Sequence, residues 1–291
     1  MVRFLLLAQL WFVGLAATSV SMGQAIPSSA TETGTPDSPP AVVPLTVRPS
    51  TFKTFLRSER DIWTSPLRLR KKDAQWLIPF SAGLAGLIAS DRHVAGALPN
   101  TPRQIRVGER FSRVGASYTL FGAAGTAYLI GRFTGNEKLR MTGRLGGEAL
   151  VHALIVTQVI KQATGRQRPE DGQGDGDFFK RRVSFPSGHA MMTWSFASVV
   201  AHQYHDRKAV VVGAYSAAFA VNLGRTMARK HFMSDSMVGS VFGYWIGTYM
   251  YHRGQRQAKA ESNGRKFWSA EITPHYSRAS GDRGVTFAWY W

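Results

Sequence analysis

Apolar and amphipathic segments with helical spacing succeed one another from residue 51 onward, and strand-like alternation is largely absent from them. A basic amphipathic stretch, 51–63, comes first and is ended by Pro66. Six longer segments follow it: 74–90, 114–131, 147–162, 189–202, 209–224 and 236–251. The pattern therefore predicts an all-α fold built as a six-helix bundle.

The relation of this bundle to a membrane is left open by the pattern. High Gly and Ala content would let the helices approach closely, as in membrane bundles. Most segments, however, offer only ~12 to 17 uncharged residues, whereas a spanning helix needs ~20. Lys and Arg occur on both sides of any topology, so the distribution of positive charge does not decide between a bundle in the bilayer and one at its surface.

The two ends of the chain differ in pattern from the helical region, which we place at 51–255. Arg3 precedes an apolar run, 4–17, and a small, polar stretch, 18–25, which together are typical of a signal peptide or N-terminal anchor in 1–25. We therefore expect export, to the periplasm or to a membrane of the cell envelope. Residues 26–49 are rich in Pro, Ser and Thr and predict a disordered linker. The tail, 256–291, alternates apolar and polar residues around 277–284, which favours a short β-hairpin.

The amino-acid composition limits the binding partners and the kinds of catalytic chemistry that the chain can have. The chain has 36 Lys and Arg against 18 Asp and Glu, a net charge of +18. Such a charge favours phosphate esters, lipid headgroups, lipopolysaccharide or nucleic acid. No nucleic-acid motif is present, so we do not expect nucleic acid as a partner, and no pattern indicates an oligomeric state. The absence of cysteine excludes disulfides, thiolate nucleophiles and thiolate metal ligands.

Three short motifs concentrate chemistry between residues 161 and 235. In the first, Lys161 and Arg168 are seven residues apart, close to two helical turns, and Pro169 follows. We expect both cations on one face of a helix that Pro169 ends, aimed at the same phosphate. Taken alone, the same residues would equally suit an ordinary helix C-terminus.

The second motif, Phe185-Pro-Ser-Gly-His189, immediately precedes an apolar run and predicts a helix N-terminus. Free backbone N–H groups at such an end favour an anion. Ser187 can cap the helix or donate its hydroxyl, Gly188 allows close backbone approach, and His189 places an imidazole beside the anion.

The third motif joins Arg225 to His231, six residues later, and to Asp235, four residues beyond. We expect His231 and Asp235 to share one face of a helix. Asp235 would then accept the Nδ1–H of the imidazole and leave Nε2 as an attacking lone pair.

In this order the three motifs resemble the signature of the type 2 phosphatidic acid phosphatase and vanadium haloperoxidase superfamily, which is Lys-x6-Arg-Pro, Pro-Ser-Gly-His and Ser-Arg-x5-His-x3-Asp. The resemblance centres on residues 147–251 and implies the helical-bundle fold of that superfamily. One position departs from the signature, because Gly224 stands where the family has serine.

The resemblance also implies a role for each matched residue. His231 would be the nucleophile that forms a phosphohistidine, Asp235 would orient it, and His189 would protonate the leaving alcohol. The phosphoryl oxygens would be held by five residues: Lys161, Arg168, Ser187, Gly188 and Arg225.

The implied activity is that of a metal-independent phosphatase acting on phosphate or diphosphate esters, with lipid phosphates as the substrate class and neither metal nor other cofactor. Two alternatives stay open, a vanadate-dependent haloperoxidase that uses the same pocket and a non-catalytic phosphate- or lipid-binding bundle. The presence of every matched polar residue apart from the family's serine favours an enzyme, and the modest chain length favours a phosphatase over a haloperoxidase.

The remaining polar patterns are weaker. The stretch 171–177 is an acidic, Gly-rich segment that resembles a calcium loop, but Arg182 occupies the position where such a loop needs glutamate. We expect a loop over the pocket instead. Six histidines match no motif: His93, His152, His202, His205, His252 and His275.

Overall fold

The computed structural model describes residues 52–65, 73–171, 175–262, 269–276 and 283–290. The predicted signal peptide or anchor and the predicted linker lie outside these residues. By their internal contacts, the described parts form two compact units, with boundaries near residues 67 and 256.

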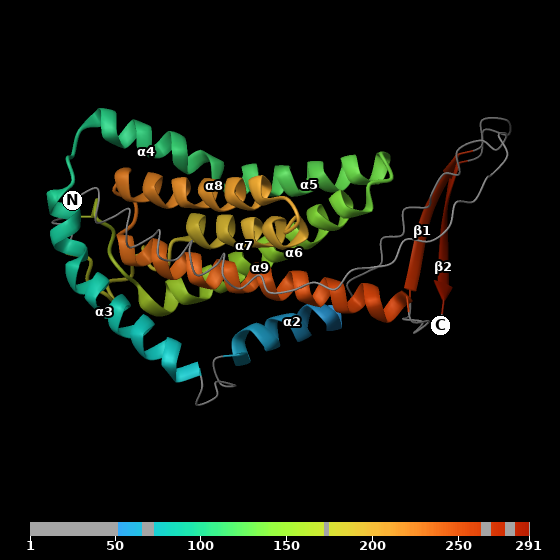
Figure 1. The fold of residues 1–291 in the computed structure, drawn as a ribbon, viewed down its shortest axis with the longest axis horizontal. Helices are drawn as coiled ribbons and strands as arrows, with labels where there is room; N and C mark the ends of the chain where they lie inside the picture. Colours follow the sequence, from blue (N-terminus) through green and yellow to red (C-terminus); the bar gives the residue numbers. More distant parts are fainter. Residues whose placement is uncertain (1–51, 66–72, 172–174, 263–268, 277–282, 291) are drawn as a thin grey trace. The chain divides into compact units, whose positions relative to one another are not determined.

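The first unit is helical and contains most of the described chain (Figure 1). Its helices are α3 (Ala74–Ala97), α4 (Pro102–Val114), α5 (Ser117–Phe133), α6 (Glu137–Thr164), α7 (Gly188–Gln203), α8 (Lys208–Met227) and α9 (Met233–Ser262), which continues past residue 256. In the second unit, α2 (Phe52–Thr64) is a helix, and strands β1 (Ser269–Tyr276) and β2 (Arg283–Tyr290) pair antiparallel from Ser269 opposite Tyr290 to Tyr276 opposite Arg283. The predicted helical fold and C-terminal hairpin are therefore confirmed.

The six predicted segments correspond to α3 and α5–α9. Most predicted boundaries were too narrow, but the segment 114–131 begins three residues before α5 does. Helix α6, for example, begins at Glu137 because Asn136 caps it, its side chain accepting a hydrogen bond of 3.0 Å from the Leu139 N–H. Helix α4 was missed altogether. It begins after Thr101, whose side chain accepts a hydrogen bond of 3.2 Å from the Gln104 N–H, and has Pro102 in its first turn.

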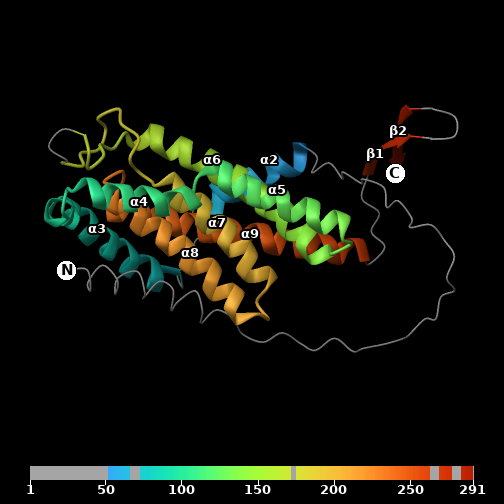
Figure 2. The ribbon, with the colours of Figure 1, turned by 90° about the horizontal axis from the view of Figure 1, so that it is seen from above.

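Within the first unit, neighbouring helices pack in the order α5, α6, α7, α8, and α4 lies along α8 (Figures 1 and 2). Helix α3 runs across one end of this bundle. Trp194 of α7 and Tyr215 of α8, with ring centroids 5.5 Å apart, pack in a buried cluster with alanines from the same two helices. The core therefore sits between consecutive helices.

Glycines set the distance between α7 and α9. Gly239, Gly243 and Gly247 are four residues apart on α9, so they share one face. A Cβ at each position would meet a backbone carbonyl of α7 at a distance that real Cβ atoms do not show, the carbonyls being those of Ser187, Met191 and Ser195. The two backbones are therefore in direct contact, and the start of α9 is held against the start of α7.

Among the described helices, none combines the length and the apolar character that a membrane crossing requires.

Candidate active site

The second motif forms the start of α7, as predicted. Ser187 is the N-cap, and its hydroxyl accepts a hydrogen bond of 3.4 Å from the Ala190 N–H. A Cβ placed on Gly188 would lie 3.9 Å from the Nζ atom of Lys161. The ammonium group of the first motif therefore lies beside the helix N-terminus of the second.

The first motif is folded differently from our prediction. Lys161 lies in the last turn of α6, but the helix ends at Thr164 because Gly165 adopts a left-handed conformation, with φ of 54°. The prediction that Lys161 and Arg168 share a helix face is therefore wrong. Arg168 lies in the loop that follows, where its N–H donates to the Oδ2 atom of Asp171 at 3.0 Å.

The third motif also departs from the predicted helix face. Helix α8 ends at Met227 and α9 begins only at Met233, so His231 lies in the connecting loop and Asp235 in the first turn of α9. The side chain of Asp235 turns back to this loop, and its Oδ2 atom accepts a hydrogen bond of 2.9 Å from the Phe232 N–H. The same oxygen lies 3.5 Å from Nδ1 of His231, so the two side chains do pair, across a helix start instead of along a helix.

Three cations of the site are close enough to disturb one another. Burial, followed by the charges of Arg168 and Arg225, lowers the pKa of Lys161 to about 8. Burial and Arg168 lower the pKa of Arg225 to about 10, against the opposing influence of Glu170 and Glu109. The site is therefore strongly electropositive and partly screened from water.

Both histidines of the motifs lie in this positive field. Burial is the largest cause that lowers the pKa of His231 to about 4, and the carboxylate of Asp235, 3.5 Å away, opposes it. Burial also lowers the pKa of His189 to about 3, assisted first by Arg225 and then by His231. At neutral pH both imidazoles are therefore uncharged, so His231 is in the form that can attack an electrophile.

Two arginine donors in the site have no hydrogen-bond partner. The Nε atoms of Arg168 and Arg225 are buried, and no acceptor within the described ranges reaches them. A buried donor without an acceptor costs free energy, which an anion bound between these arginines would recover.

A buried ion-pair network that the motifs did not reveal holds Asp235. Its Oδ1 atom accepts a hydrogen bond of 2.6 Å from Arg166, and its Oδ2 atom accepts one of 2.6 Å from the Ser184 hydroxyl. Although burial opposes ionisation, the pairing with His231, Arg166 and Ser184 lowers the pKa of Asp235. Asp235 is thus kept as a carboxylate facing His231.

Arg166 links this carboxylate to α3. Its Nη2 atom donates to Asp91 at 2.9 Å, and its guanidinium lies between the rings of Phe178 and Phe232, at 4.7 and 4.5 Å from their centroids. The side chains of Arg166 and Asp91 are each only 2% exposed. Asp91 directly follows the predicted apolar segment 74–90 and is itself followed by Arg92, so no local pattern marks it as the buried partner of Arg166.

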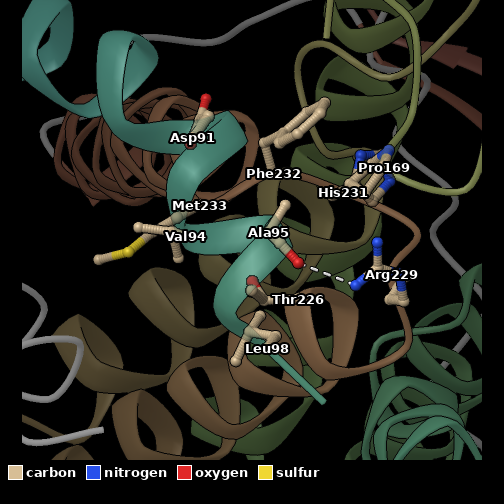
Figure 3. Close-up of a pocket in the computed structure, with 10 residues that line it drawn as sticks. All are labelled: Asp91, Val94, Ala95, Leu98, Pro169, Thr226, Arg229, His231, Phe232 and Met233. Carbon is tan, nitrogen blue, oxygen red and sulfur yellow. Dashed lines mark hydrogen bonds between the residues drawn. The ribbon is translucent and has the colours of Figure 1, made fainter. Parts of the chain in front are cut away.

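A small hollow lies beside His231 at the junction of α3 with the loop before α9 (Figure 3). It is lined by Asp91, Val94, Ala95, Leu98, Pro169, Thr226, Arg229, His231, Phe232 and Met233. Arg229 fixes the junction by donating to the carbonyl of Ala95 at 2.9 Å. The hollow has room for about one water molecule, so it is no binding pocket for a large group as it stands.

Comparison with known proteins agrees with the three motifs. The sequence model of the PAP2 superfamily matches residues 146–259, a segment that contains all of them. The resemblance drawn from the motifs is therefore confirmed, and this segment is similar to the PAP2 superfamily.

Individual relatives are more distant. A PA-phosphatase related-family protein of Dictyostelium discoideum is 26% identical over 154 residues, which are 45% of this chain and 54% of the relative. The chain thus spans about half the length of this curated relative. A transmembrane PAP2-type phosphatidylglycerolphosphate phosphatase from Bacillus subtilis is similar in structure, with a TM-score of 0.45 and 19% identity over 72% of this chain and 94% of that one. LpxE from Aquifex aeolicus has a TM-score of 0.40 and 22% identity over 56% of this chain and 92% of that one.

Proposed function

We propose that the protein is a metal-independent phosphatase that hydrolyses phosphate esters of lipids through a phosphohistidine on His231. One observation carries the proposal: the N-terminus of α7, three partly exposed cations and the paired His231 and Asp235 lie close together, although they come from three separate stretches of sequence. Fixed positive charge around a nucleophile is what phosphoryl transfer requires.

In the first step, Nε2 of His231 attacks phosphorus while the ester P–O bond breaks. The bond electrons pass to the leaving oxygen, which takes a proton from His189. Lys161, Arg168 and Arg225 balance the charge on the phosphoryl oxygens, together with the Ser187 hydroxyl and the Gly188 N–H. Asp235 holds the Nδ1–H of His231 and balances the positive charge that develops on the ring.

In the second step, water attacks the phosphohistidine and gives its proton to His189, the N–P bond breaks, and inorganic phosphate leaves. His189 must therefore be protonated when the ester binds, although its pKa is about 3 in the ligand-free pocket. Binding of the phosphate ester would raise the pKa of His189, because its negative charge offsets the charges of the neighbouring cations.

Lipid phosphates are proposed as the substrate class on two grounds. The curated relative is named for phosphatidic acid phosphatase. The helical unit also exposes large apolar side chains, among them Ile78 and Trp76 of α3 at 67% and 62% and Phe133 and Tyr118 of α5 at 83% and 73%. Exposed apolar groups of this size are typical of surfaces that meet a membrane or another protein. We accordingly propose an exported enzyme associated with a membrane of the cell envelope.

The proposal is tested by phosphate release from the full-length chain in excess EDTA, with phosphatidic acid in detergent micelles and p-nitrophenyl phosphate as substrates. His231→Gln should reduce release by several orders of magnitude, because the covalent route is lost. His205→Gln is the matched control, since His205 is exposed and belongs to no motif.

Release that survives EDTA, disappears with His231→Gln and persists with His205→Gln is the expected result. Undiminished phosphate release by His231→Gln would show that His231 is not the nucleophile. Tight phosphate binding without turnover would favour a binding protein, and halide oxidation after addition of vanadate would favour a haloperoxidase.

A further inference from the structure

Four arginines form one stripe on α4. Arg103, Arg106, Arg110 and Arg113 follow one another at spacings of three, four and three residues, which places them on one face of a helix. All four are exposed. The helix carries a single acidic residue, Glu109, so four arginines against one glutamate leave it a net charge of +3.

An apolar stripe runs beside the arginines. Val107 is half-buried, while Phe111 and Val114, four and seven residues later, are 49% and 48% exposed. An exposed helix face that combines arginines with an aromatic and an aliphatic edge has the character of an interfacial membrane helix.

Helix α4 packs along α8 (Figure 1), and its buried residues lie on the face opposite the arginines. Gly108 and Ser112 are buried, and a Cβ on Gly108 would lie 2.7 Å from the carbonyl oxygen of Gly224 on α8. The side-chain amide of Gln104 also donates to the carbonyl of Met227 at 3.2 Å. Helix α4 therefore has no freedom to turn its charged face inward.

Among the described residues, these four arginines are not neutralised by ion pairs. In the parts of the chain that the structure describes, no carboxylate pairs with Arg103, Arg106, Arg110 or Arg113. Arginine stripes of this kind lower their electrostatic energy by meeting an anionic surface.

This stripe borders the candidate active site. Helix α8, on which α4 lies, ends two residues after Arg225, and Glu109 of α4 is close enough to Arg225 to influence its pKa. An anionic surface bound by α4 would thus lie next to the cations of the candidate active site.

We propose that α4 binds the anionic surface of a phospholipid bilayer, with its arginines at the level of the lipid phosphates and with Phe111 and Val114 in the apolar boundary. A lipid surface is favoured over a nucleic acid because the apolar stripe gains contacts only in the former. The proposal deepens the membrane association proposed above by naming the helix that carries it, and it does not depend on turnover.

The experiment measures partition of the full-length chain onto vesicles of phosphatidylcholine with and without phosphatidylglycerol. Its readout is the ratio of the two partition coefficients, which cancels any contribution of the N-terminal segment that does not depend on lipid charge. The double variant Arg106→Gln, Arg110→Gln removes the centre of the stripe. Its control, Arg207→Gln, Arg256→Gln, makes the same change of charge at exposed arginines that lie outside α4.

Each arginine near an anionic surface contributes about fivefold to binding, or about 1 kcal/mol, so the α4 variant should lower the ratio by about 25-fold. The control should change it far less, and added salt should weaken the wild-type preference. Equal losses in both variants, or no preference of the wild type for anionic vesicles, would overturn the proposal. Binding of duplex DNA that equals vesicle binding and is lost with the α4 arginines would overturn it in favour of a nucleic-acid surface. Phosphatase activity enters none of these outcomes, so its absence would leave the test intact.

Discussion

Arg166 is the residue whose replacement should show most clearly how the fold supports the site. Its guanidinium donates to Asp235 at 2.6 Å, to Asp91 at 2.9 Å, to the Ser234 hydroxyl at 2.7 Å and to the carbonyl of Gly176 at 3.0 Å. A lysine keeps the charge but lacks the planar fork that reaches both carboxylates and the carbonyl together.

The expected cost follows from these contacts. A hydrogen bond to a charged group contributes about 1.5–3 kcal/mol, and Arg166→Lys loses at least two of them, so the free energy of unfolding should fall by about 3–6 kcal/mol. Asp235 would still be held by Ser184 and by the N–H of Phe232, but less firmly. We expect kcat to fall by about 10- to 100-fold, as for other partners that orient a reacting group.

Urea unfolding gives the first quantity, and turnover of p-nitrophenyl phosphate by the folded fraction gives the second. Arg253→Lys is the control, because Arg253 is also buried and pairs with Glu148, which belongs to none of the motifs. Asp91→Asn separates orientation from packing, since it leaves the contact between Arg166 and Asp235 in place and should affect stability more than kcat. Wild-type kcat in Arg166→Lys, or an equal loss in Arg253→Lys, would refute the argument.

Two further predictions concern packing and protonation. Gly224→Ser, which restores the residue of the family signature, should lower the free energy of unfolding by about 1–3 kcal/mol, because its Cβ would lie 2.7 Å from the carbonyl oxygen of Gly108. Gly213→Ser on the same helix should not lower the free energy of unfolding, because nothing lies within 4 Å of a Cβ at that position. Equal effects of the two substitutions in urea unfolding would contradict the close contact at Gly224. The folded pKa of His231, about 4, is below its ordinary 6.5, so its neutral burial contributes stability above pH 6.5 that is lost as the pH falls towards 4, up to about 3 kcal/mol. His231→Gln should reduce the slope of stability against pH in this window, to which His189 also contributes, and an unchanged slope would show that His231 is not buried in its neutral form.

The sequence was sufficient for features that local chemistry decides. A serine before glycine and an apolar run predicted the start of α7, and Ser187 caps it there. Long apolar segments predicted six helices because each buries a face against a neighbour. The hairpin followed from alternation of apolar and polar residues, which has a period of two in strands.

Features decided by distant contacts were not predictable in this way. Helix α4 carries few apolar residues, and its docking depends on a glycine contact with α8. The end of α6 depends on the left-handed conformation of Gly165, which residue spacing does not reveal. Arg166 and Arg168 are two residues apart, yet the first pairs with buried carboxylates and the second with Glu170, close enough to Lys161 to lower its pKa. The acceptor Asp91 precedes Arg166 by 75 residues, a separation that no local pattern covers.

The central claim, that His231 carries the phosphoryl group, is tested most directly by trapping the covalent intermediate. Full-length chain mixed with p-nitrophenyl phosphate is quenched within the first turnovers in alkali, where phosphohistidine survives, and its peptides are analysed by mass spectrometry. We predict the mass of one phosphoryl group on the peptide that contains His231, stable in alkali and lost in acid, and absent from His231→Gln. Turnover without any phosphorylated peptide, or a phosphoryl group on another residue, would contradict the account.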